Sequence, residues 1–316
     1  MKIDRNVLQA CWCLAGPTAC GKSAVSLELA RQLNAEIIAL DSMTLYRGMD
    51  IGTAKPSLQD RAAVRHHLFD ILDPHEDFSV AEYVTAAERC CRDILARGRT
   101  PLFVGGAGLY LRSLLRGVFE GPAADLTYRA ELEAIASTDG EAALHEQLQR
   151  IDPITAARLP PQDVRRIIRA LEVFHVTGQP ISAQQQEQPI LGADSPRRVF
   201  WLDRPRAELH HRINARVEQM FADGLVEEVR CLRDSPGGFG RTARQALGYK
   251  EVLDWLDTGT GSITEAIATV QTRTRQFAKR QMTWFRNLVE CRAVALAEPE
   301  SPATTVARLL ALGQRD

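Results

Sequence analysis

Short apolar runs alternate with longer amphipathic segments through the first third of the chain. The short runs have the length of buried strands and cover residues 11–15 (CWCLA), 36–40 (EIIAL), 66–72 (HHLFDIL) and 101–104 (PLFV). The longer segments repeat apolar residues at helical spacing and cover residues 22–33 (KSAVSLELARQL), 79–98 (SVAEYVTAAERCCRDILARG) and 108–117 (GLYLRSLLRG). Strands that alternate with helices predict βαβ units, and therefore an α/β fold with a parallel sheet flanked by helices.

The strand pattern stops in the middle of the chain. Helical periodicity alone is found at residues 128–136 (YRAELEAIA), 142–151 (AALHEQLQRI) and 163–178 (DVRRIIRALEVFHVTG). A polar, turn-rich stretch at 182–197 suits a return linker, and RRVFWLD at 197–203 predicts a strand that rejoins the sheet. We therefore expect an all-helical insertion domain at 118–196, and a core made of 1–117 and 197–316 whose remaining segments are helical.

A candidate phosphate-binding loop lies between the first predicted strand and the first predicted helix. GPTACGKS, Gly16 to Ser23, matches the pattern G-x-x-x-x-G-K-[ST]. In such a P-loop the backbone amides and the helix N-terminus bind an anion, Lys22 neutralises it and the Ser23 hydroxyl helps to hold Mg²⁺. The alternative is a glycine-rich turn that merely caps the helix.

Two further polar features follow predicted strands. Asp41 comes directly after EIIAL, and the glycine pair Gly105 and Gly106 comes after PLFV. Ligands of open parallel sheets bind at the carboxyl ends of the strands, so these features and the phosphate loop are expected to share one pocket. The residues alone leave open whether Asp41 is a metal ligand, a general base or a capping residue; Asp203, after VFWLD, is a weaker second candidate.

Composition limits the class of protein. Of the 316 residues 45% are hydrophobic and 25% are charged, as expected for a folded globular chain. No apolar run approaches the roughly 20 residues of a membrane span, and the N-terminus does not resemble a signal peptide, so a cytoplasmic location is expected. The seven cysteines form no C-x-x-C pair, which favours reduced thiols, and two adjacent histidine pairs cannot form one metal site. We expect a monomer, since no large apolar interface is indicated.

Charge is unevenly distributed although the formal net charge is only −1. Five lysines leave 34 arginines among the 39 cationic residues. Arginines gather at Arg165, Arg166 and Arg169, and again at 271–286 (QTRTRQFAKRQMTWFR), where aromatic residues are interleaved and no acidic residue occurs. Arginine with aromatics suits contacts to phosphates and unpaired bases, and a solvated helix face is the ordinary alternative.

Several motifs together resemble one family, the tRNA dimethylallyltransferases (tRNA isopentenyltransferases). They occur in that family's order over nearly the whole chain: GPTACGKS, DSMTLYRGMDIGTAKP, VGGAGLYLRSLL, RALEVF, ALGYKE and RTRQFAKRQMTWFR. The resemblance implies transfer of a dimethylallyl group from dimethylallyl diphosphate to N6 of the adenosine at tRNA position 37, next to the anticodon. The phosphate loop would then hold the diphosphate of an isoprenoid, with Mg²⁺ as cofactor and the tRNA anticodon stem-loop as partner.

The resemblance also implies roles for individual residues. Catalytic roles fall to Asp41 as general base and to Lys22, Ser23 and Arg216, with Ser23 as the metal ligand. Diphosphate contacts fall to the loop residues Gly16, Pro17, Thr18, Ala19, Cys20, Gly21, Lys22 and Ser23. Contacts to tRNA fall to three segments: Asp41, Ser42, Met43 and Thr44; Arg165, Arg166, Ile167, Ile168 and Arg169; and Gln245, Ala246, Leu247, Gly248, Tyr249 and Lys250.

Some positions depart from the family's pattern. Ala107 replaces a threonine, Thr44 and Leu45 replace glutamine and valine, and Cys20 replaces a serine and is a candidate reactive thiol. The chain resembles the compact bacterial type, without a zinc-finger extension. Three alternatives stay open: an adenylate isopentenyltransferase acting on free AMP, ADP or ATP; a P-loop kinase that binds ATP; and an RNA-binding protein without catalytic activity.

Overall fold

The chain forms two compact units. The computed structural model describes residues 2–185, 188–190, 192, 195–297 and 300–314. One unit is Gly117–Gln188, and the other combines Lys2–Arg116 with Pro189–Asp316. The smaller unit begins one residue before the predicted insertion, and the described residues after Gln188 belong to the larger unit. Residues 186, 187, 191, 193 and 194 of the predicted linker lie outside the described part of the chain.

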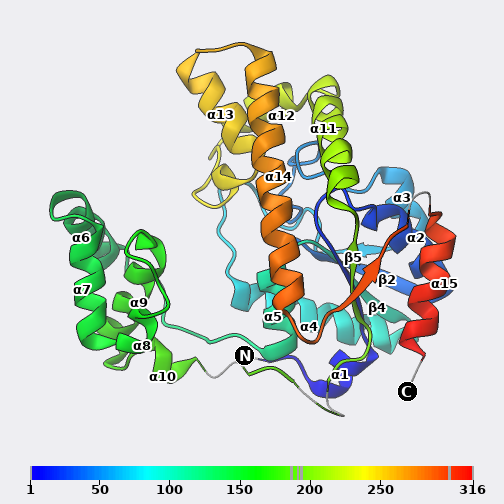
Figure 1. Ribbon diagram of the computed structural model, residues 1–316, viewed down its shortest axis with the longest axis horizontal. Helices are drawn as coiled ribbons and strands as arrows, with labels where there is room; N and C mark the ends of the chain where they lie inside the picture. The colour runs from blue at the N-terminus through cyan, green and yellow to red at the C-terminus, as the bar shows by residue number, and fades with distance from the viewer. Residues whose placement is uncertain (1, 186–187, 191, 193–194, 298–299, 315–316) are drawn as a thin grey trace. The chain divides into compact units, whose positions relative to one another are not determined.

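The larger unit contains a six-stranded, all-parallel sheet (Figure 1). Its strands, in the order β3-β2-β4-β1-β5-β6, are β3 (His66–His67), β2 (Ala35–Leu40), β4 (Thr100–Gly105), β1 (Trp12–Ala15), β5 (Val199–Asp203) and β6 (Arg292–Ala295). The predicted α/β fold with a parallel sheet flanked by helices is therefore confirmed.

The register of the central strands fixes where the site lies. Gly105 at the end of β4 pairs with Ala15 at the end of β1 and with Leu40 at the end of β2. The three segments that follow these strands, beginning at Gly16, Asp41 and Gly106, therefore start side by side at one edge of the sheet, as the sequence predicts.

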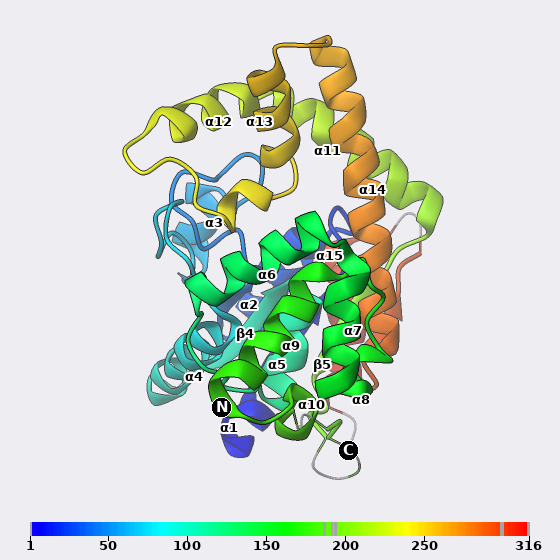
Figure 2. The same cartoon turned by 90° about the vertical axis from the view of Figure 1, so that its left-hand side faces the viewer.

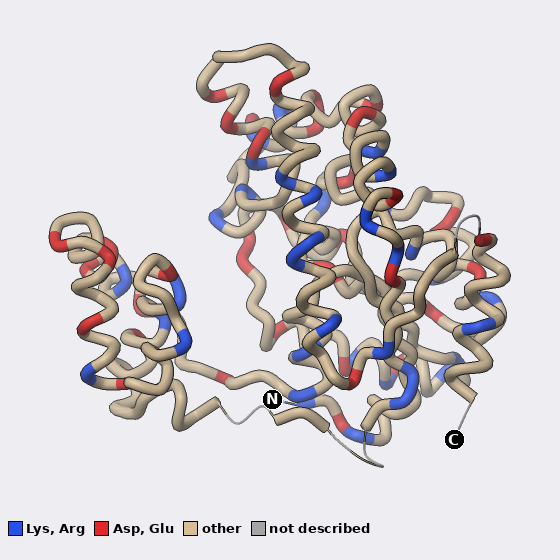
Figure 3. Tube along the Cα trace, viewed as in Figure 1, with Lys and Arg blue, Asp and Glu red and all other residues tan. Residues whose placement is uncertain are grey.

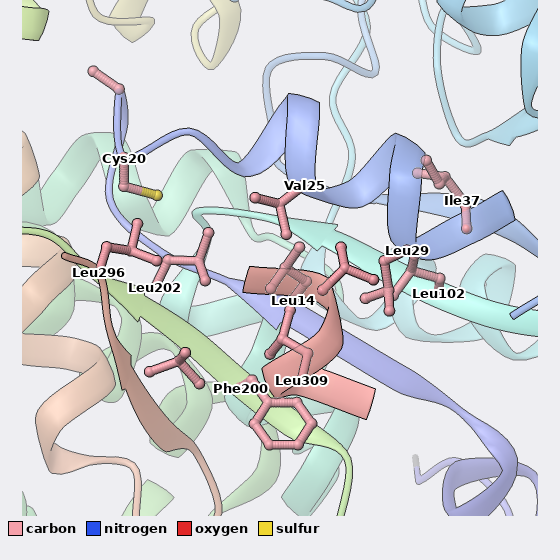
Figure 4. Close-up of a cluster of buried hydrophobic side chains, with 14 of the residues drawn as sticks. Leu14, Cys20, Val25, Leu29, Ile37, Leu102, Phe200, Leu202, Leu296 and Leu309 are labelled. Carbon is pink, nitrogen blue, oxygen red and sulfur yellow. The ribbon is translucent and has the colours of Figure 1, made fainter. Parts of the chain in front are cut away.

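The core of the larger unit lies between the sheet and its covering helices (Figure 4). Every residue of β1 and β2 is buried, as expected for parallel strands covered on both faces. Leu14 and Phe200 of the sheet meet Leu29 of α2 (Lys22–Gln32) and Leu309 of α15 (Pro302–Gly313) in one cluster. Helix α4 (Val80–Ala96) packs on β2 and β4, and its Tyr83 hydroxyl donates to the Ala39 carbonyl at 2.8 Å.

Two elements of the sheet differ from the sequence prediction. The run 66–72 forms a strand only at His66–His67, because Leu68 and Asp70 adopt positive φ angles of 60° and 55° that end the extended backbone. The edge strand β6 has no counterpart in the apolar pattern, since Val294 is its only buried residue.

The remaining helices of the larger unit carry the rest of the site. Helices α11 and α14 pack along each other, and α13 contacts both α12 and α14 (Figures 1 and 2). Their bounds, with those of the shorter helices, are α1 (Arg5–Ala10), α3 (Leu58–Ala63), α5 (Gly108–Arg116), α11 (Arg206–Ala222), α12 (Leu225–Asp234), η2 (Ala243–Gln245), α13 (Tyr249–Thr258) and α14 (Ile263–Asn287). In the described part of the chain we find no helix with the length and apolar character of a membrane span.

The smaller unit is all-helical among its described residues. Its helices are α6 (Leu126–Thr138), α7 (Glu141–Ile151), α8 (Pro153–Ala156), α9 (Val164–Thr177) and α10 (Ile181–Gln184). Leu144 and Leu148 of α7 pack against Ile167 and Leu171 of α9, so the unit has an apolar core of its own. The buried Glu172 carboxylate accepts hydrogen bonds from the Arg129 guanidinium at 2.7 and 2.9 Å and pairs with Arg169.

Candidate active site

A cavity of about 620 Å³ opens in the larger unit where the phosphate loop, the segment after β2 and the loop after β4 meet. Helix α14 and part of α11 complete its wall. Residues that line this cavity include Thr18, Lys22, Ser23, Asp41, Ser42, Met43, Thr44, Gly52, Gly106, Ala107, Gly108, Arg216, Gln245, Ala246, Leu247, Arg273, Phe277, Arg280, Gln281 and Trp284.

The phosphate loop has the backbone that its glycines predict. Gly16 and Gly21 have φ angles of 155° and 103°, and a Cβ on Gly16 would lie 2.8 Å from the Cys20 sulfur. Ala19 also adopts a positive φ, 64°, which is uncommon for a residue with a side chain. Helix α2 begins at Lys22, so its unpaired N-terminal amides lie at the loop, as an anion site requires.

Lys22 is folded back onto the loop that it follows. Its ammonium donates hydrogen bonds to the Gly16 and Pro17 carbonyls, both at 2.8 Å. Burial lowers the pKa of Lys22 and the Arg216 charge lowers it further, while Cys20 and Asp41 act in the opposite direction. A half-buried lysine beside a second cation favours an anionic ligand that would restore charge balance.

Asp41 presents its carboxylate to the same cavity. One carboxylate oxygen accepts a hydrogen bond from the Met43 amide at 2.8 Å, which holds the side chain against the turn that follows β2. Burial raises the pKa of Asp41, and the bonds from the Met43 and Thr44 amides and the Lys22 charge only partly offset this. The Thr44 hydroxyl is buried without a hydrogen-bond partner among the described residues.

Arg216 reaches the cavity from α11. The described residues give its guanidinium no hydrogen bond and no ion pair, and burial together with the neighbouring Arg212 lowers its pKa. Within the described part of the chain, Lys22 and Arg216, two basic side chains that line the cavity near the phosphate loop, thus both lack a carboxylate partner at ion-pair distance. This is the electrostatic character of a site for an anion.

In the loop after β4, each glycine packs so closely against a neighbour that a side chain would not fit. A Cβ on Gly105 would overlap the Leu40 carbonyl, a Cβ on Gly106 would overlap the Gln281 amide, and a Cβ on Gly108 would lie 2.8 Å from Trp284. Two of these neighbours come from α14, which therefore packs directly on the glycine loop.

One face of α14 forms the wall opposite the sheet, and cations follow the helix (Figure 3). The Arg280 guanidinium lies 5.7 Å from the centre of the Phe277 ring, and that of Arg112 lies 5.6 Å from the Trp284 ring. Not every residue of the predicted basic segment faces the cavity: the Arg275 guanidinium donates to Asn214 of α11 at 2.6 Å, and Phe285 is buried against Trp201.

The long loop DSMTLYRGMDIGTAKP is held by residues that sequence reasoning missed. The Glu228 carboxylate accepts hydrogen bonds from the amides of Asp50, Ile51 and Gly52 at 3.0, 2.8 and 3.3 Å, and from the Tyr249 hydroxyl at 2.5 Å. A Cβ on Gly52 would overlap the Tyr249 ring. Glu228 lies in an ordinary amphipathic helix, so no local pattern distinguishes it.

Lys55 fixes the other end of that loop. Its ammonium donates to the Tyr46 carbonyl at 2.5 Å and pairs with Asp50 and Asp70 at 2.7 and 2.5 Å. Lysine is rare in this chain, with five among 39 cationic residues, so its presence at position 55 was a signal that the sequence analysis did not use.

The residues predicted to contact tRNA at 245–250 differ in exposure: some line the cavity and others do not. Gln245, Ala246 and Leu247 line the cavity, whereas the Tyr249 side chain is 0% exposed and serves the loop described above. Gly248, at a φ of 89°, precedes α13, and the side chain of Lys250 is on the exposed part of that helix. Part of the predicted segment thus lines the cavity, while burial removes the Tyr249 side chain from any direct contact in this conformation.

In the smaller unit, the residues predicted to contact tRNA at 165–169 also differ in exposure. Arg165 and Arg166 are exposed, with Arg166 3.3 Å from Asp163. The side chains of Ile167 and Ile168 lie in the unit's core, and Arg169 pairs with Glu172. Arg165 and Arg166 are thus exposed, Arg169 is partly exposed but paired with Glu172, and the two isoleucines are buried.

The structure also places two weaker sequence candidates, Asp203 and Cys20, and one histidine. Asp203 is not among the cavity's lining residues and its carboxylate lies 3.9 Å from Arg286. Cys20 is fully buried, which removes the exposure that a reactive thiol needs. His66, given no role from the sequence, does line the cavity, with Nδ1 2.6 Å from the Val64 carbonyl.

A phosphate loop, a half-buried carboxylate and two cations with no carboxylate partner among the described residues line one cavity, the arrangement expected of an enzyme that acts on a phosphorylated substrate. The comparisons with known proteins narrow this class. The IPP transferase family model matches residues 44–288, and the isopentenyl transferase model matches residues 9–72. A tRNA dimethylallyltransferase of Geobacter sulfurreducens is 48% identical over 275 residues, which are 86% of this chain and 88% of the relative. That of Geobacillus thermodenitrificans is 45% identical over 296 residues, 93% and 92% of the two chains.

Solved structures agree with the sequence relatives. The full-length tRNA isopentenylpyrophosphate transferase of Bacillus halodurans matches with a TM-score of 0.67 and 39% identity, covering 96% of both chains. A eukaryotic dimethylallyltransferase described as acting on tRNA matches with a TM-score of 0.74 and 28% identity, covering 94% of this chain and 76% of the other. The chain belongs to the IPP transferase family, and it is a prenyltransferase.

Proposed function

We propose that this enzyme transfers a dimethylallyl group from dimethylallyl diphosphate to N6 of the adenosine at tRNA position 37. The observation that carries the proposal is that the phosphate loop, Asp41 and Arg216 line one cavity. The names of the relatives support tRNA as the acceptor over free adenylate, and support prenyl transfer over phosphorylation by a kinase. We place the enzyme in the cytoplasm, acting as a monomer.

Binding of the leaving diphosphate drives the reaction. An allylic carbon–oxygen bond breaks readily when the negative charge that builds up on the diphosphate is stabilised. The amides at the start of α2, the Lys22 ammonium and the Arg216 guanidinium are the groups of this chain that supply that stabilisation. They are fixed in a partly buried wall, where a charge interaction is stronger than in water.

Asp41 accepts the proton of the attacking amine. The adenine N6 lone pair is delocalised into the ring, so the amine needs a base as its bond to the allylic carbon forms. The raised pKa of Asp41 makes its carboxylate a stronger base than an exposed aspartate, while its bond from Met43 keeps it oriented. The N6–carbon bond forms, the carbon–oxygen bond breaks, the proton goes to Asp41 and the electron pair leaves on the diphosphate.

The site suits Mg²⁺ as cofactor. Mg²⁺ prefers oxygen ligands, keeps several waters and is commonly held by one or two protein oxygens together with substrate phosphates. The Ser23 hydroxyl is exposed to the cavity at the start of α2, and the Asp41 carboxylate lies in the same cavity, so the donor set fits. Ser23 would hold the ion, which would neutralise charge on the diphosphate.

The acceptor base must leave the anticodon-loop stack to reach Asp41. Enzymes that modify a base commonly turn it into a pocket lined by aromatic and cationic side chains. Phe277, Arg280 and Trp284 of α14 offer such a lining, and Gln245 to Leu247 lie on the same cavity. The smaller unit would bind the stem-loop through Arg165 and Arg166.

A transfer assay tests this function. Purified protein with Mg²⁺ and radiolabelled dimethylallyl diphosphate is given either an anticodon stem-loop with adenosine at position 37 or free AMP. We expect label in the stem-loop, and a loss of about a thousandfold or more in Asp41→Asn because the base is removed. Asp203→Asn is the matched control and should keep wild-type activity, since Asp203 lies outside the cavity lining.

Each other outcome assigns a different function. Label in AMP alone would identify an adenylate-modifying enzyme, and phosphorylation of a small acceptor with ATP would identify a kinase. RNA binding without label in any acceptor would indicate a catalytically inactive binding protein. Equal activity in wild type and Asp41→Asn would reject Asp41 as the base while leaving the reaction assigned.

A further inference from the structure

The phosphate loop contains too few glycines to explain its own shape. Only Gly16 and Gly21 are glycine, and between them Ala19 holds a positive φ of 64°. A non-glycine residue in that region carries strain of about 1 kcal/mol or more, and it persists only where the surroundings enforce it. Side chains from outside the loop must therefore help to fix this backbone.

Gln281 of α14 holds the loop from the cavity side. Its side-chain oxygen accepts a hydrogen bond from the Thr18 amide at 2.9 Å, and its side-chain nitrogen donates to the Gly106 carbonyl at 2.9 Å. Gln281 is 5% exposed, and both ends of its amide are used. It therefore ties the phosphate loop to the glycine loop after β4, immediately before the residue with positive φ.

Arg212 of α11 holds the loop from the other neighbouring helix. Its guanidinium Nε donates to the Ala19 carbonyl at 2.8 Å, and the next peptide is held by Arg204, whose Nε donates to the Cys20 carbonyl at 2.9 Å. In a trans peptide the carbonyl and the following amide point in opposite directions. Arg212, by fixing the Ala19 carbonyl, therefore fixes the direction of the Cys20 amide, and Arg204 in the same way fixes the direction of the Gly21 amide, one of the groups that an anion would use.

We propose that Gln281 and Arg212 are positioning residues of the diphosphate site, which hold the phosphate loop in its ligand-binding shape on either side of Ala19. In this role both side chains act through the backbone of the loop rather than by direct contact with the ligand. The inference rests on the proposed function, since it takes the ligand of the loop to be a diphosphate.

Calorimetry with Mg²⁺ and inorganic pyrophosphate tests this role without any transfer chemistry. The variants are Gln281→Met, which removes both hydrogen bonds at similar volume, Arg212→Met, and Arg212→Lys, which keeps a donor for the Ala19 carbonyl. We expect the first two to weaken pyrophosphate binding about tenfold, and Arg212→Lys to recover part of the loss. Gln219→Met and Arg92→Met are matched controls, because among the described residues the Gln219 side chain bonds only to Asp223, which caps α11, and the Arg92 side chain only to Glu88 of α4.

A kinetic measurement separates positioning from general destabilisation. The KM for dimethylallyl diphosphate should rise in Gln281→Met and Arg212→Met by the same factor as the pyrophosphate Kd, while the KM for the RNA stem-loop changes less than twofold. Wild-type affinity in both variants at unchanged Tm overturns the proposal. Arg212 is largely exposed, so Arg212→Met decides the matter if Gln281→Met does not fold.

The same measurements distinguish this inference from the function on which it rests. A wild-type protein that binds pyrophosphate but transfers no prenyl group rejects the function and leaves the two positioning residues testable by calorimetry. A wild-type protein that binds no pyrophosphate rejects the diphosphate site and the positioning roles together.

Discussion

Burial shifts the pKa values of two charged residues of the site in opposite directions. It raises the pKa of Asp41 and lowers the pKa of Lys22, because in both cases the neutral form is favoured away from water. Each charge supports the other, since the Lys22 charge favours ionised Asp41 and the Asp41 charge favours protonated Lys22. The shifts bring the two ionisations closer together, which narrows the pH range in which both groups are charged.

This narrowing predicts the pH dependence of the reaction. Transfer needs ionised Asp41, so kcat/KM should rise as pH increases through a pKa above the usual aspartate value of about 4. It also needs protonated Lys22, so kcat/KM should fall at high pH through a pKa below the usual lysine value of about 10.4. Steady-state rates with dimethylallyl diphosphate and the stem-loop measure both limbs. In Lys22→Arg the alkaline limb should move to higher pH, because arginine stays protonated; an unmoved limb would exclude Lys22 as its source.

The same shift predicts that Asp41 lowers stability. Its folded pKa is raised above the unfolded value, so its protonation favours the folded state at low pH and this contribution is lost as pH rises through the raised pKa. At neutral pH the ionised side chain therefore costs folding free energy. Urea unfolding at pH 7 should show Asp41→Asn to be at least as stable as wild type, although it is inactive. If Asp41→Asn were less stable than wild type, the folded protein would favour the ionised Asp41 carboxylate over its neutral form.

Ala19 gives a second stability prediction at a single position. Ala19→Gly relieves the strain of a positive φ but adds unfolded-state entropy, so the free energy of unfolding should stay the same or rise by up to about 1 kcal/mol. Ala215→Gly, at an exposed position inside α11, should instead lower it by about 1 kcal/mol. Urea titration measures the free energy of unfolding of both variants. An equal decrease in the two would show that the backbone at position 19 carries no strain.

At the scale of elements, long-range contacts mark the limit of sequence reasoning. The strand ends at Ala15, Leu40 and Gly105 could be predicted, because apolar runs bounded by polar turns are local signals. The partners of the glycine loop could not, since Gln281 lies on a helix that no local pattern connects with Gly106. Strand β6 was missed for a related reason: it is an edge strand, and its pairing with β5 rather than its apolar content makes it extended.

Helix α12 supplies a pair of adjacent glutamates for a test of one such contact. Glu228 accepts three backbone amides and the Tyr249 hydroxyl, so Glu228→Gln replaces a charged acceptor and should lower the free energy of unfolding by about 2–3 kcal/mol. Glu227 is 67% exposed on its side chain, and among the described residues it pairs only with Arg230. Glu227→Gln should therefore change the free energy of unfolding by less than about 0.5 kcal/mol. Urea unfolding followed by circular dichroism compares them. Equal effects would indicate that the amides around Asp50 do not depend on the Glu228 charge.

At the scale of the whole molecule, the net charge of −1 conceals the cationic helix α14. Bulk charge would not attract RNA to this protein, so association has to rely on local groups of arginines. The sequence located these groups, at 165–169 and 271–286, because arginine density is a composition signal. It could not tell which arginines face outward: Arg169 and Arg275 are committed to Glu172 and Asn214, whereas Arg165 is exposed and Arg280 lines the cavity.

The smaller unit is therefore predicted to bind the anticodon stem-loop, and this binding can be measured separately from the transfer reaction. In the double variant Arg165→Gln with Arg166→Gln, the KM for the anticodon stem-loop should rise about tenfold, and the slope of log affinity against log salt should fall by about 1 to 2, since up to two phosphate contacts are lost. The KM for dimethylallyl diphosphate should not change, because the diphosphate site lies within the larger unit.

The double variant Arg150→Gln with Arg158→Gln removes the same charge from other exposed positions of that unit and serves as the control. If both double variants weaken RNA binding equally, the unit acts through bulk charge rather than through the start of α9. If neither does, the assignment of residues 165–169 to RNA contact is wrong, and the basic face of α14 would have to carry recognition of the stem-loop by itself.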